Sequence, residues 1–305
     1  MSSIPRVVLA PNRTIPSLGF GVGTAWFKSP QERRPALKAA VHAALDAGFM
    51  HLDEAEMYAN EECTGDALRE WLAAHPTPRE TLHVTSKVMD VDSDGGIEAV
   101  CRRSLQALGC GHFDLYLVHA PFNRDGSPFR TPLHGVWAQM ESLVDKGLAA
   151  AIGVSNWRIC DLQAVFDGAR IKPCCNQIEA HPYLQQSGLF EYCAQRNIAL
   201  AAYAPLAPLT KMHGGPVDAV VDSAAAAHKA SPAQVLLRWS LQMGMLAITT
   251  TSKPERLEEY KGIWGFELSA EQMAAISEAG RANPRRLYWT QCAPMFQTDP
   301  RLEPA

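Results

Sequence analysis

The sequence predicts an α/β fold, a closed (β/α)8 barrel with an N-terminal β-hairpin and an irregular C-terminal tail. Short apolar, strand-like runs alternate with amphipathic helical runs along all 305 residues. The strand-like runs lack polar alternation, which is typical of parallel sheets covered on both faces. Eight such units in a chain of this length favour a closed barrel over an open sheet. No linker or repeat divides the chain, so we expect a single domain over residues 1–305.

The eight predicted strands are each bounded by turn residues. They cover residues 19–24, 50–53, 82–87, 113–119, 149–154, 174–178, 198–203 and 246–249. The helical runs between and after them cover residues 30–48, 95–109, 132–147, 157–168, 184–197, 217–230 and 255–262. Several of these runs end at a glycine, which is a common C-cap.

Three segments lie outside the repeat. Residues 6–16 predict a hairpin around Pro11-Asn12-Arg13 that could plug the floor of the barrel. Residues 269–282 predict an extra helix that starts with Ser-x-Glu. Residues 283–305 predict an irregular C-terminal loop over the active-site mouth, rich in Pro, Arg and aromatic residues.

Composition limits the class of protein. The formal net charge of -4 argues against nucleic acid or an anionic membrane as the main partner, because both favour basic faces. We expect no membrane span and no signal peptide, since no window holds ~18 apolar residues and the N-terminus has no basic and apolar signal pattern. The eight cysteines show no metal-binding spacing, so we expect a cytoplasmic protein without a metal site.

One set of polar residues gathers where three successive predicted strands end. Asp53 and, five residues later, Tyr58 follow strand two, Lys87 ends strand three and His119 ends strand four. In a parallel barrel the carboxyl ends of all strands open on the same mouth, where active sites lie. Each residue alone is more often structural, as a helix cap or a solvated charge. Together they predict a catalytic group.

This group suits the donation of a proton to a carbonyl oxygen. A free tyrosine has a pKa near ~10, which is high for acid catalysis at neutral pH. An ammonium about 4 Å away would favour phenolate by up to ~4 kcal/mol, so we expect Lys87 to lower the pKa of Tyr58. Asp53 would hold Lys87, and His119 would orient the substrate oxygen or assist the proton.

Several motifs in series resemble the aldo-keto reductase family. They are GFGVGTAW at 19–26, HLDEAEMYANEECTG at 51–65, LYLVH at 115–119, IGVSN at 152–156, NQIEAHP at 176–182 and AYAPL at 202–206. The similarity runs from about residue 6 to about residue 290. Residues 205–209, 235–242, 249–256 and 282–284 look closest to the fungal branch that contains conjugated polyketone reductase and ketopantoyl lactone reductase.

The resemblance implies hydride transfer from NADPH to a carbonyl, with Tyr58 as the acid and Asp53, Lys87 and His119 in support. It further implies that Ser155, Asn156 and Gln177 hold the carboxamide and that Tyr203 stacks on the nicotinamide. The remaining cofactor residues that it implies are Thr24, Ala25, Asp53 and Leu206. The family is often monomeric, although the sequence itself does not fix the oligomeric state.

Strand eight departs from the commoner family pattern. Thr250 stands where that pattern has a lysine, and Lys253 follows three residues later. A helix start, hydroxyl groups and two cations still make an anion site, so we expect it to bind the 2′-phosphate of NADPH. The residues expected there are Thr250, Thr251, Ser252, Lys253 and Arg256. A simple helix N-cap cluster is the alternative.

Aromatic and apolar residues near the predicted strand ends indicate a hydrophobic substrate pocket. The residues expected to line it are Trp26, Phe27, Met89, Phe122, Trp157, Tyr288 and Trp289. They suit a ketone, a conjugated diketone or ketolactone, or an aldehyde.

Two rival functions remain open on the sequence. One is a non-catalytic NADPH-binding regulator or partner subunit on the same barrel, which would not need Tyr58. The other is a phosphate-handling isomerase or aldolase, which would need a base or a Schiff-base lysine. The chain has no Gly-x-Gly-x-x-Gly fingerprint and no Gly-x-Ser-x-Gly elbow, which argues against a Rossmann site and an α/β-hydrolase.

Overall fold

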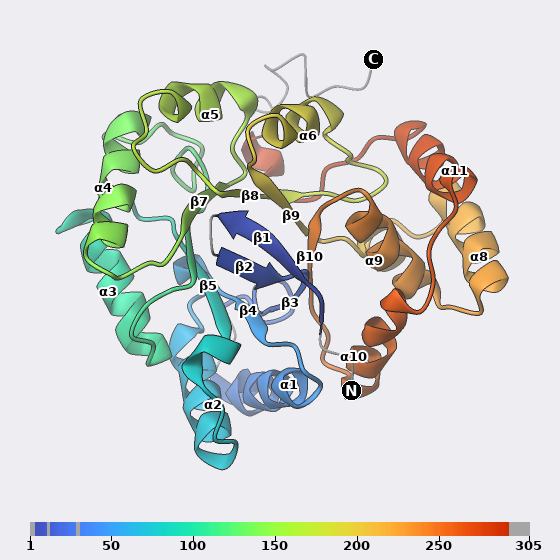
Figure 1. Ribbon diagram of the computed structural model, residues 1–305, viewed down its shortest axis with the longest axis horizontal. Coiled ribbons are helices and arrows are strands. Elements are labelled where there is room, and N and C mark those ends of the chain that lie inside the picture. Colours follow the sequence, from blue (N-terminus) through green and yellow to red (C-terminus); the bar gives the residue numbers. More distant parts are fainter. Residues whose placement is uncertain (1–3, 11–12, 29–30, 293–305) are drawn as a thin grey trace.

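The computed structural model describes residues 4–10, 13–28 and 31–292, which contain a closed barrel of eight parallel strands ringed by helices (Figure 1). The barrel strands are β3 (Leu18–Gly21), β4 (His51–Asp53), β5 (His83–Val88), β6 (Leu115–Val118), β7 (Ile152–Ser155), β8 (Cys175–Glu179), β9 (Ala199–Tyr203) and β10 (Leu246–Thr249). Each strand pairs with the next along the chain, and β10 closes the barrel against β3. The predicted fold class is therefore confirmed. The first strand ends at Gly21, so Thr24 lies in a loop beyond it.

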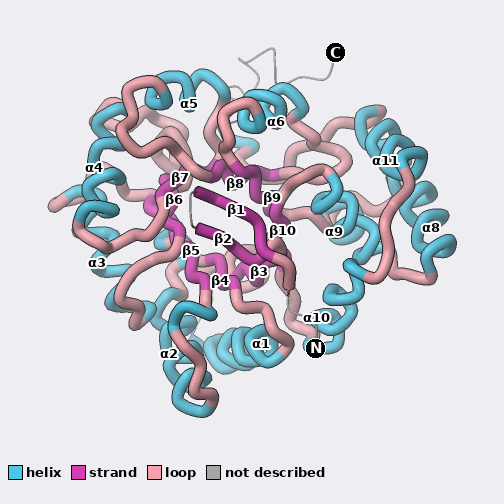
Figure 2. Tube along the Cα trace, viewed as in Figure 1, coloured by secondary structure: helices cyan, strands magenta, loops and turns pink. Residues whose placement is uncertain are grey.

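The predicted hairpin is also present and covers one end of the barrel. Strands β1 (Arg6–Ala10) and β2 (Arg13–Pro16) pair antiparallel and lie across the barrel in the view of Figures 1 and 2. Leu9 and Ile15 of the hairpin pack in one cluster with Leu115, Leu117 and Leu246 of the barrel. The hairpin thus closes the floor with apolar side chains and leaves the opposite mouth for function.

Eleven α-helices and five short 3-10 helices cover the described residues. The α-helices are α1 (Arg34–Asp46), α2 (Glu61–Ala74), α3 (Gly96–Leu108), α4 (Leu133–Asp145), α5 (Ile159–Phe166), α6 (Ser187–Ala194), α7 (Ala207–Thr210), α8 (Pro216–His228), α9 (Pro232–Gln242), α10 (Pro254–Lys261) and α11 (Ala270–Arg281). The 3-10 helices are η1 (Gln31–Arg33), η2 (Glu56–Tyr58), η3 (Arg79–Thr81), η4 (Gly262–Trp264) and η5 (Thr290–Cys292).

Three helices, α2, α9 and the four-residue α7, are absent from the sequence prediction. Helix α2 follows η2 after a short turn and buries Cys63, Ala67 and Trp71 at helical spacing, packed against α1 and α3. Helix α9 begins at a capping box, in which the Ser231 hydroxyl accepts from the backbone N–H of Gln234. The helix expected at 217–230, between strands seven and eight, is present as α8 and packs on the extra helix α11 outside the ring (Figure 1).

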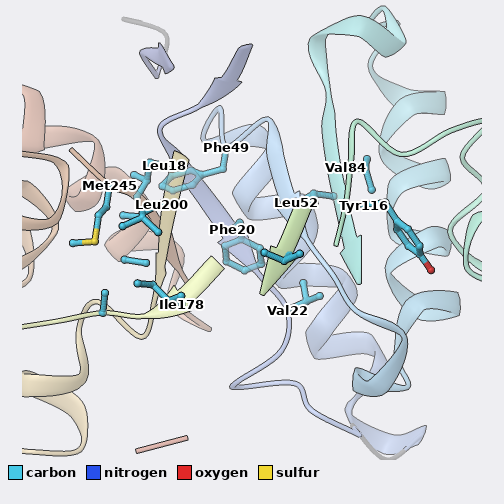
Figure 3. Close-up of a cluster of buried hydrophobic side chains, with 14 of the residues drawn as sticks. Leu18, Phe20, Val22, Phe49, Leu52, Val84, Tyr116, Ile178, Leu200 and Met245 are labelled. Carbon is cyan, nitrogen blue, oxygen red and sulfur yellow. The ribbon is translucent and has the colours of Figure 1, made fainter. Parts of the chain in front are cut away.

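Alternation along the strands separates the helix-facing side chains from the barrel interior. Phe20, Leu52 and Val84 pair in register on β3, β4 and β5 and belong to the core shared with the helices. Figure 3 shows Phe20 and Leu52 side by side in that core. Since successive side chains of a strand point to opposite faces, Asp53 and Thr85 face the barrel interior. The β-sheet period therefore sends Asp53 inward at the mouth.

Candidate active site

Three neighbouring strands bring their polar ends together at the mouth of the barrel. Asp53 is the last residue of β4, Lys87 lies one residue before the end of β5, and His119 directly follows β6. Lys87 pairs in register with Leu117, which faces the interior, so Lys87 also points inward. The parallel register therefore places all three side chains at one level, as the sequence predicts.

Lys87 is the centre of this group. Its Nζ donates to Asp53 Oδ1 at 2.5 Å and Oδ2 at 3.0 Å, to the Glu54 carbonyl at 2.9 Å and to Tyr58 Oη at 3.2 Å. The side chain is completely buried. Burial opposes its charge, but Asp53 and Tyr58 outweigh burial and raise the pKa of Lys87 above its ordinary value. Lys87 therefore keeps its proton and directs it at the phenol.

Tyr58 stands at the end of η2, with its ring at the mouth. The backbone N–H of Lys28 donates to the Tyr58 carbonyl at 2.7 Å and fixes the loop from β3 beside it. Gly23 lies against the ring, because a Cβ there would come within 2.6 Å of Tyr58 Cζ. Glycine is needed here for close approach.

The pKa of Tyr58 differs from the sequence prediction. Burial against the surrounding walls raises it to about 12, although Lys87 lowers it, and the half-buried ring lines a pocket. The expectation of a net decrease neglected this desolvation, which is the larger effect. The phenol thus holds its proton throughout the neutral range and is a donor rather than a base.

His119 lies across the mouth from the phenol, and its ring centroid is 5.7 Å from that of Tyr58. Burial, and then the nearby charge of Lys87, lower the pKa of His119 well below its ordinary value. The imidazole is therefore neutral at neutral pH. A neutral ring can donate one hydrogen bond to a substrate oxygen, but it is not a strong acid.

A chain of hydrogen bonds joins this group to strands β7, β8 and β9. Gln177 Nε2 donates to Asp53 Oδ2 at 2.7 Å, and Ser155 Oγ donates to the Gln177 carbonyl at 2.8 Å. Asn156 donates to Ser155 Oγ at 3.0 Å and accepts from the Tyr203 hydroxyl at 2.8 Å. Asn156 has a φ of 59°, which asparagine tolerates better than most residues. These hydrogen bonds hold Gln177, Ser155, Asn156 and Tyr203, which are predicted cofactor residues, in one polar wall.

A single cavity of about 670 Å³ contains most of the predicted site. Its wall includes Tyr58 and His119, which follow β4 and β6, and Thr250 and Arg256, which follow β10. The predicted cofactor residues on this wall are Thr24, Ala25, Asp53, Ser155, Asn156, Gln177, Tyr203, Leu206, Thr250 and Arg256. Thr251, Ser252 and Lys253 are not on it. The Thr251 hydroxyl instead accepts from the backbone N–H of Lys253 at 3.0 Å, just before α10.

Only part of the predicted substrate pocket lines the cavity. Phe27, Tyr288 and Trp289 lie on its wall. Four other predicted residues do not: Trp26, Met89, Phe122 and Trp157 are buried in the core instead. The sequence indicates their apolar character correctly, but burial in packed loops also demands apolar side chains.

Other wall residues were not predicted from the sequence. Arg124 lies on the loop after β6, and Lys211 follows α7. Tyr260 of α10 also lies on the wall and is buried against Thr249. The described part of the tail also contributes Leu287 and Gln291, whereas residues 293–305 lie outside the described residues. Loop positions of this kind carry no periodic signal in a sequence.

Glu54 adds an unused carboxyl group behind the site. Its side chain is fully buried, and its Oε2 accepts from the backbone N–H of Ala55 at 3.1 Å. Burial, with a contribution from Glu61, raises the pKa of Glu54 to about 8. No group of three or more His, Cys, Asp or Glu residues in the described chain could hold a metal ion. None of its helices is long and apolar enough to cross a membrane.

The cavity fits a nicotinamide dinucleotide. The buried Thr250 hydroxyl has no partner among the described residues and lies on the wall near Arg256. Tyr203, with its ring held by Asn156, and the polar wall of β7 and β8 stand near the proton donor. One end can thus receive a phosphate and the other an amide-bearing ring.

The comparisons with known proteins agree with this arrangement. Residues 18–281 match the aldo/keto reductase family. The chain is 37% identical over 289 residues to the NAD/NADP-dependent indole-3-acetaldehyde reductase of Schizosaccharomyces pombe, covering 92% of this chain and 98% of that one. It is 33% identical to the NADPH-dependent alpha-keto amide reductase of Saccharomyces cerevisiae, over 91% of both chains.

Solved structures show the same likeness. The Bombyx mori aldo-keto reductase in complex with NADP superposes with a TM-score of 0.84 at 29% identity, covering 92% of this chain and 94% of that one. The aldose reductase of Schistosoma japonicum gives a TM-score of 0.83 at 31% identity, covering 96% and 97%. The predicted fungal branch stays a prediction, because relatives from fish and cyanobacteria are similar to a comparable degree. The chain belongs to the aldo/keto reductase family and is an NADP-dependent oxidoreductase that acts on carbonyl groups.

Proposed function

We propose that this protein reduces a ketone, a conjugated diketone or ketolactone, or an aldehyde, with Tyr58 as the general acid. The observation that carries the proposal is the contact of 3.2 Å between Lys87 Nζ and Tyr58 Oη in a fully buried ion pair with Asp53. This contact stabilises the phenolate that remains after the proton has left. Without it, the buried phenol would be a still weaker acid.

Each residue of the candidate site has its own part in the proposed proton transfer. The bound dinucleotide supplies a hydride to the carbonyl carbon, and Tyr58 gives its proton to the carbonyl oxygen. Lys87 stabilises the phenolate, and Asp53 keeps Lys87 charged and in place. His119, neutral at neutral pH, donates a hydrogen bond that orients the carbonyl oxygen. Solvent then returns a proton to Tyr58.

The polar wall positions the dinucleotide in this proposal. Ser155, Asn156 and Gln177 hold the carboxamide, and Tyr203 supports the nicotinamide ring. Gln177 already donates to Asp53, so the same side chain couples the position of the ring to that of the Lys87 partner. Thr250 and Arg256 bind phosphate groups at the other end of the cavity.

The substrate end of the cavity suits aromatic or conjugated carbonyl compounds. Phe27, Tyr288 and Trp289 present aromatic rings there, and the Trp289 ring lies 6.0 Å from that of His119. The two fungal relatives are named for an aromatic aldehyde and for alpha-keto amides. We therefore choose indole-3-acetaldehyde as the first substrate to test.

The test is the substitution Tyr58→Phe. We expect turnover of indole-3-acetaldehyde, followed by loss of NADPH absorbance, to fall by at least ~10²–10⁴, the usual contribution of general acid catalysis. NADPH binding, followed by fluorescence titration, should persist. Tyr116→Phe is the matched control, since the buried Tyr116 hydroxyl has no partner among the described residues. Unchanged turnover in Tyr58→Phe would exclude this residue as the acid.

The non-catalytic alternative gives a different result. A regulator that only binds NADPH would show tight binding without turnover of any carbonyl compound in the wild type.

A single domain, a cytoplasmic location and a monomeric state stay predictions of the sequence. Size-exclusion chromatography with light scattering tests the monomeric state.

A further inference from the structure

Arg124 is a cation at the substrate end of the cavity that the proposed chemistry does not use. It lies in the loop between β6 and α4, directly after the aromatic Phe122 and Asn123, and it lines the same cavity as Tyr58 and His119. None of the ion pairs formed by the described residues involves Arg124. Its contact with the protein is with the ring of Phe27, where Cζ lies 5.8 Å from the ring centroid.

Phe27 links this cation to the proton donor. The Phe27 ring is 6.2 Å from the Tyr58 ring, edge to face, and is among the few exposed large hydrophobic side chains of the described residues. Lys28 Nζ lies 5.7 Å from the same ring. The Phe27 ring therefore lies between Tyr58 on one side and the cations Arg124 and Lys28 on the other.

The charges on the cavity wall divide into two groups. Lys211 and Arg256 lie on the side of β9 and β10, near Thr249 and Thr250, where they suit the phosphates of the dinucleotide. Arg124 lies on the other side, with Phe27 and Trp289. The dinucleotide phosphates therefore do not account for it.

The acidic side chains next to Arg124 in the chain, beside Met89 or on the cavity wall are hydrogen-bonded to other groups. The Asp125 carboxylate accepts from the backbone N–H of Ser127 at 2.9 Å and from its hydroxyl at 2.6 Å. Glu56 accepts from the backbone N–H of Met89 at 2.9 Å. Asp53, the acidic residue on the described wall, is bound by Lys87 and Gln177. Each of these carboxylates keeps its own charge, but none of them forms an ion pair with Arg124 among the described residues, so its guanidinium is open to a carboxylate of the substrate.

We propose that Arg124 determines specificity for carbonyl substrates that carry a carboxylate at the far end of an apolar spacer. The carbonyl lies at Tyr58 and His119, the spacer packs on Phe27, and the carboxylate pairs with the guanidinium, whose planar fork matches a carboxylate. The inference rests on the proposed function, because that function places the carbonyl group of the substrate and the inference places its carboxylate in the same site.

The test compares para-carboxybenzaldehyde with its methyl ester, which keeps the ring and the aldehyde but removes the charge. The wild type should prefer the acid by kcat/KM, and Arg124→Gln should lower this acid-to-ester ratio about tenfold, the lower end for a charge-assisted hydrogen bond because the site is exposed. The loss should lie in KM, since the contact is far from the reacting carbon. Arg130→Gln removes the same charge from the same loop but away from the cavity wall, and it should leave the ratio unchanged.

A binding measurement separates this inference from the proposed function. Calorimetry of the product, para-hydroxymethylbenzoate, with the NADP-loaded protein should show binding that Arg124→Gln weakens about tenfold and Arg130→Gln does not. If the wild type reduces neither aldehyde, the proposed function fails, and calorimetry still decides the role of Arg124. An acid-to-ester ratio and a product affinity that are the same in Arg124→Gln and the wild type would overturn the inference.

Discussion

Two buried ionisable groups at opposite ends of the barrel, His51 at the floor and Lys87 at the mouth, differ in whether they carry charge. Strands β4 and β5 each begin near the floor with a histidine, His51 and His83, and carry Asp53 and Lys87 near the mouth. His51 and Lys87 are buried to almost the same extent. Burial lowers the pKa of His51 to about 4, so it stays neutral, whereas Lys87 keeps its charge.

The hydrogen-bond and ion-pair partners of the two side chains explain why only Lys87 keeps its charge. His51 Nε2 has the Thr85 hydroxyl at 3.0 Å, its Nδ1 has no partner among the described residues, and the His83 ring lies edge to face at 4.9 Å. Lys87 has two carboxylate oxygens, a carbonyl and a phenol. A buried group keeps its charge only where opposite charge and hydrogen bonds replace water. At the floor, the backbone of Pro16 and the charges of Asp53 and Asp114 favour the charged form of His51, but they do not outweigh burial.

The largest effect should come from breaking the ion pair at the mouth. Lys87→Met leaves the buried Asp53 carboxylate unpaired, so we expect a loss of about 3–5 kcal/mol in the free energy of unfolding and a strong loss of turnover. The double variant Asp53→Asn with Lys87→Met removes both charges and should recover most of the stability but none of the activity. Urea unfolding curves with activity assays measure both. Equal stability of the two variants would contradict the account of the pair.

The floor should respond to acid. Because the folded state lowers the pKa of His51 below the ordinary ~6.5, the unfolded state binds more protons below that pH. Stability from this residue is therefore complete above about pH 6.5, falls by up to about 3 kcal/mol as the pH drops, and levels off near pH 4.

The control for this effect is His51→Gln, which keeps a polar group near Thr85 but does not titrate. The difference in unfolding free energy between wild type and variant, measured from pH 7 to pH 4, isolates His51 from the carboxylates. A difference that does not change with pH would show that the floor histidine gains its proton without cost.

Close packing at the mouth gives the next effect. In Gly23→Ala the new Cβ would meet Tyr58 Cζ at 2.6 Å, so the ring must shift away from Lys87. A misplacement of about 1 Å can cost ~10²-fold in rate, and we expect a loss of this order in kcat. Gly111→Ala is the matched control, because a Cβ there meets no atom within 4 Å. Similar rates for the two variants would show that the ring can move without consequence.

The smallest effect should distinguish two cations near strand β10. Arg256 lies on the cavity wall and Lys253 does not, so Arg256→Ala should weaken NADPH binding about tenfold and Lys253→Ala less than about threefold. NADH binding should change little in either variant. Added salt should reduce the difference in NADPH affinity between the wild type and Arg256→Ala. Fluorescence titrations with both dinucleotides measure this. The opposite ranking would restore Lys253 as the main phosphate ligand expected from the sequence.

Sequence reasoning placed Asp53, Lys87 and His119 together at one mouth because strand order and side-chain alternation are local properties. Asp53, Lys87 and His119 needed only three strand ends and a parallel register to meet at one mouth. Helix α2 was missed although its apolar residues recur at helical spacing, because the segment also carries the motif residues after Tyr58. Of the seven residues expected in the substrate pocket, Trp26, Met89, Phe122 and Trp157 pack in the core instead. An apolar side chain suits either place equally.

The amino-acid sequence by itself determined the barrel, the hairpin at its floor and the identity of the four residues at its mouth, because periodicity and residue order encode them. Tertiary structure alone decided the ionisation of Tyr58 and His119, the exclusion of Lys253 from the cavity wall and the place of Arg124 at the substrate end. These properties depend on how many atoms replace water around a group and on which distant loops face it. Neither quantity can be read from neighbours in the chain.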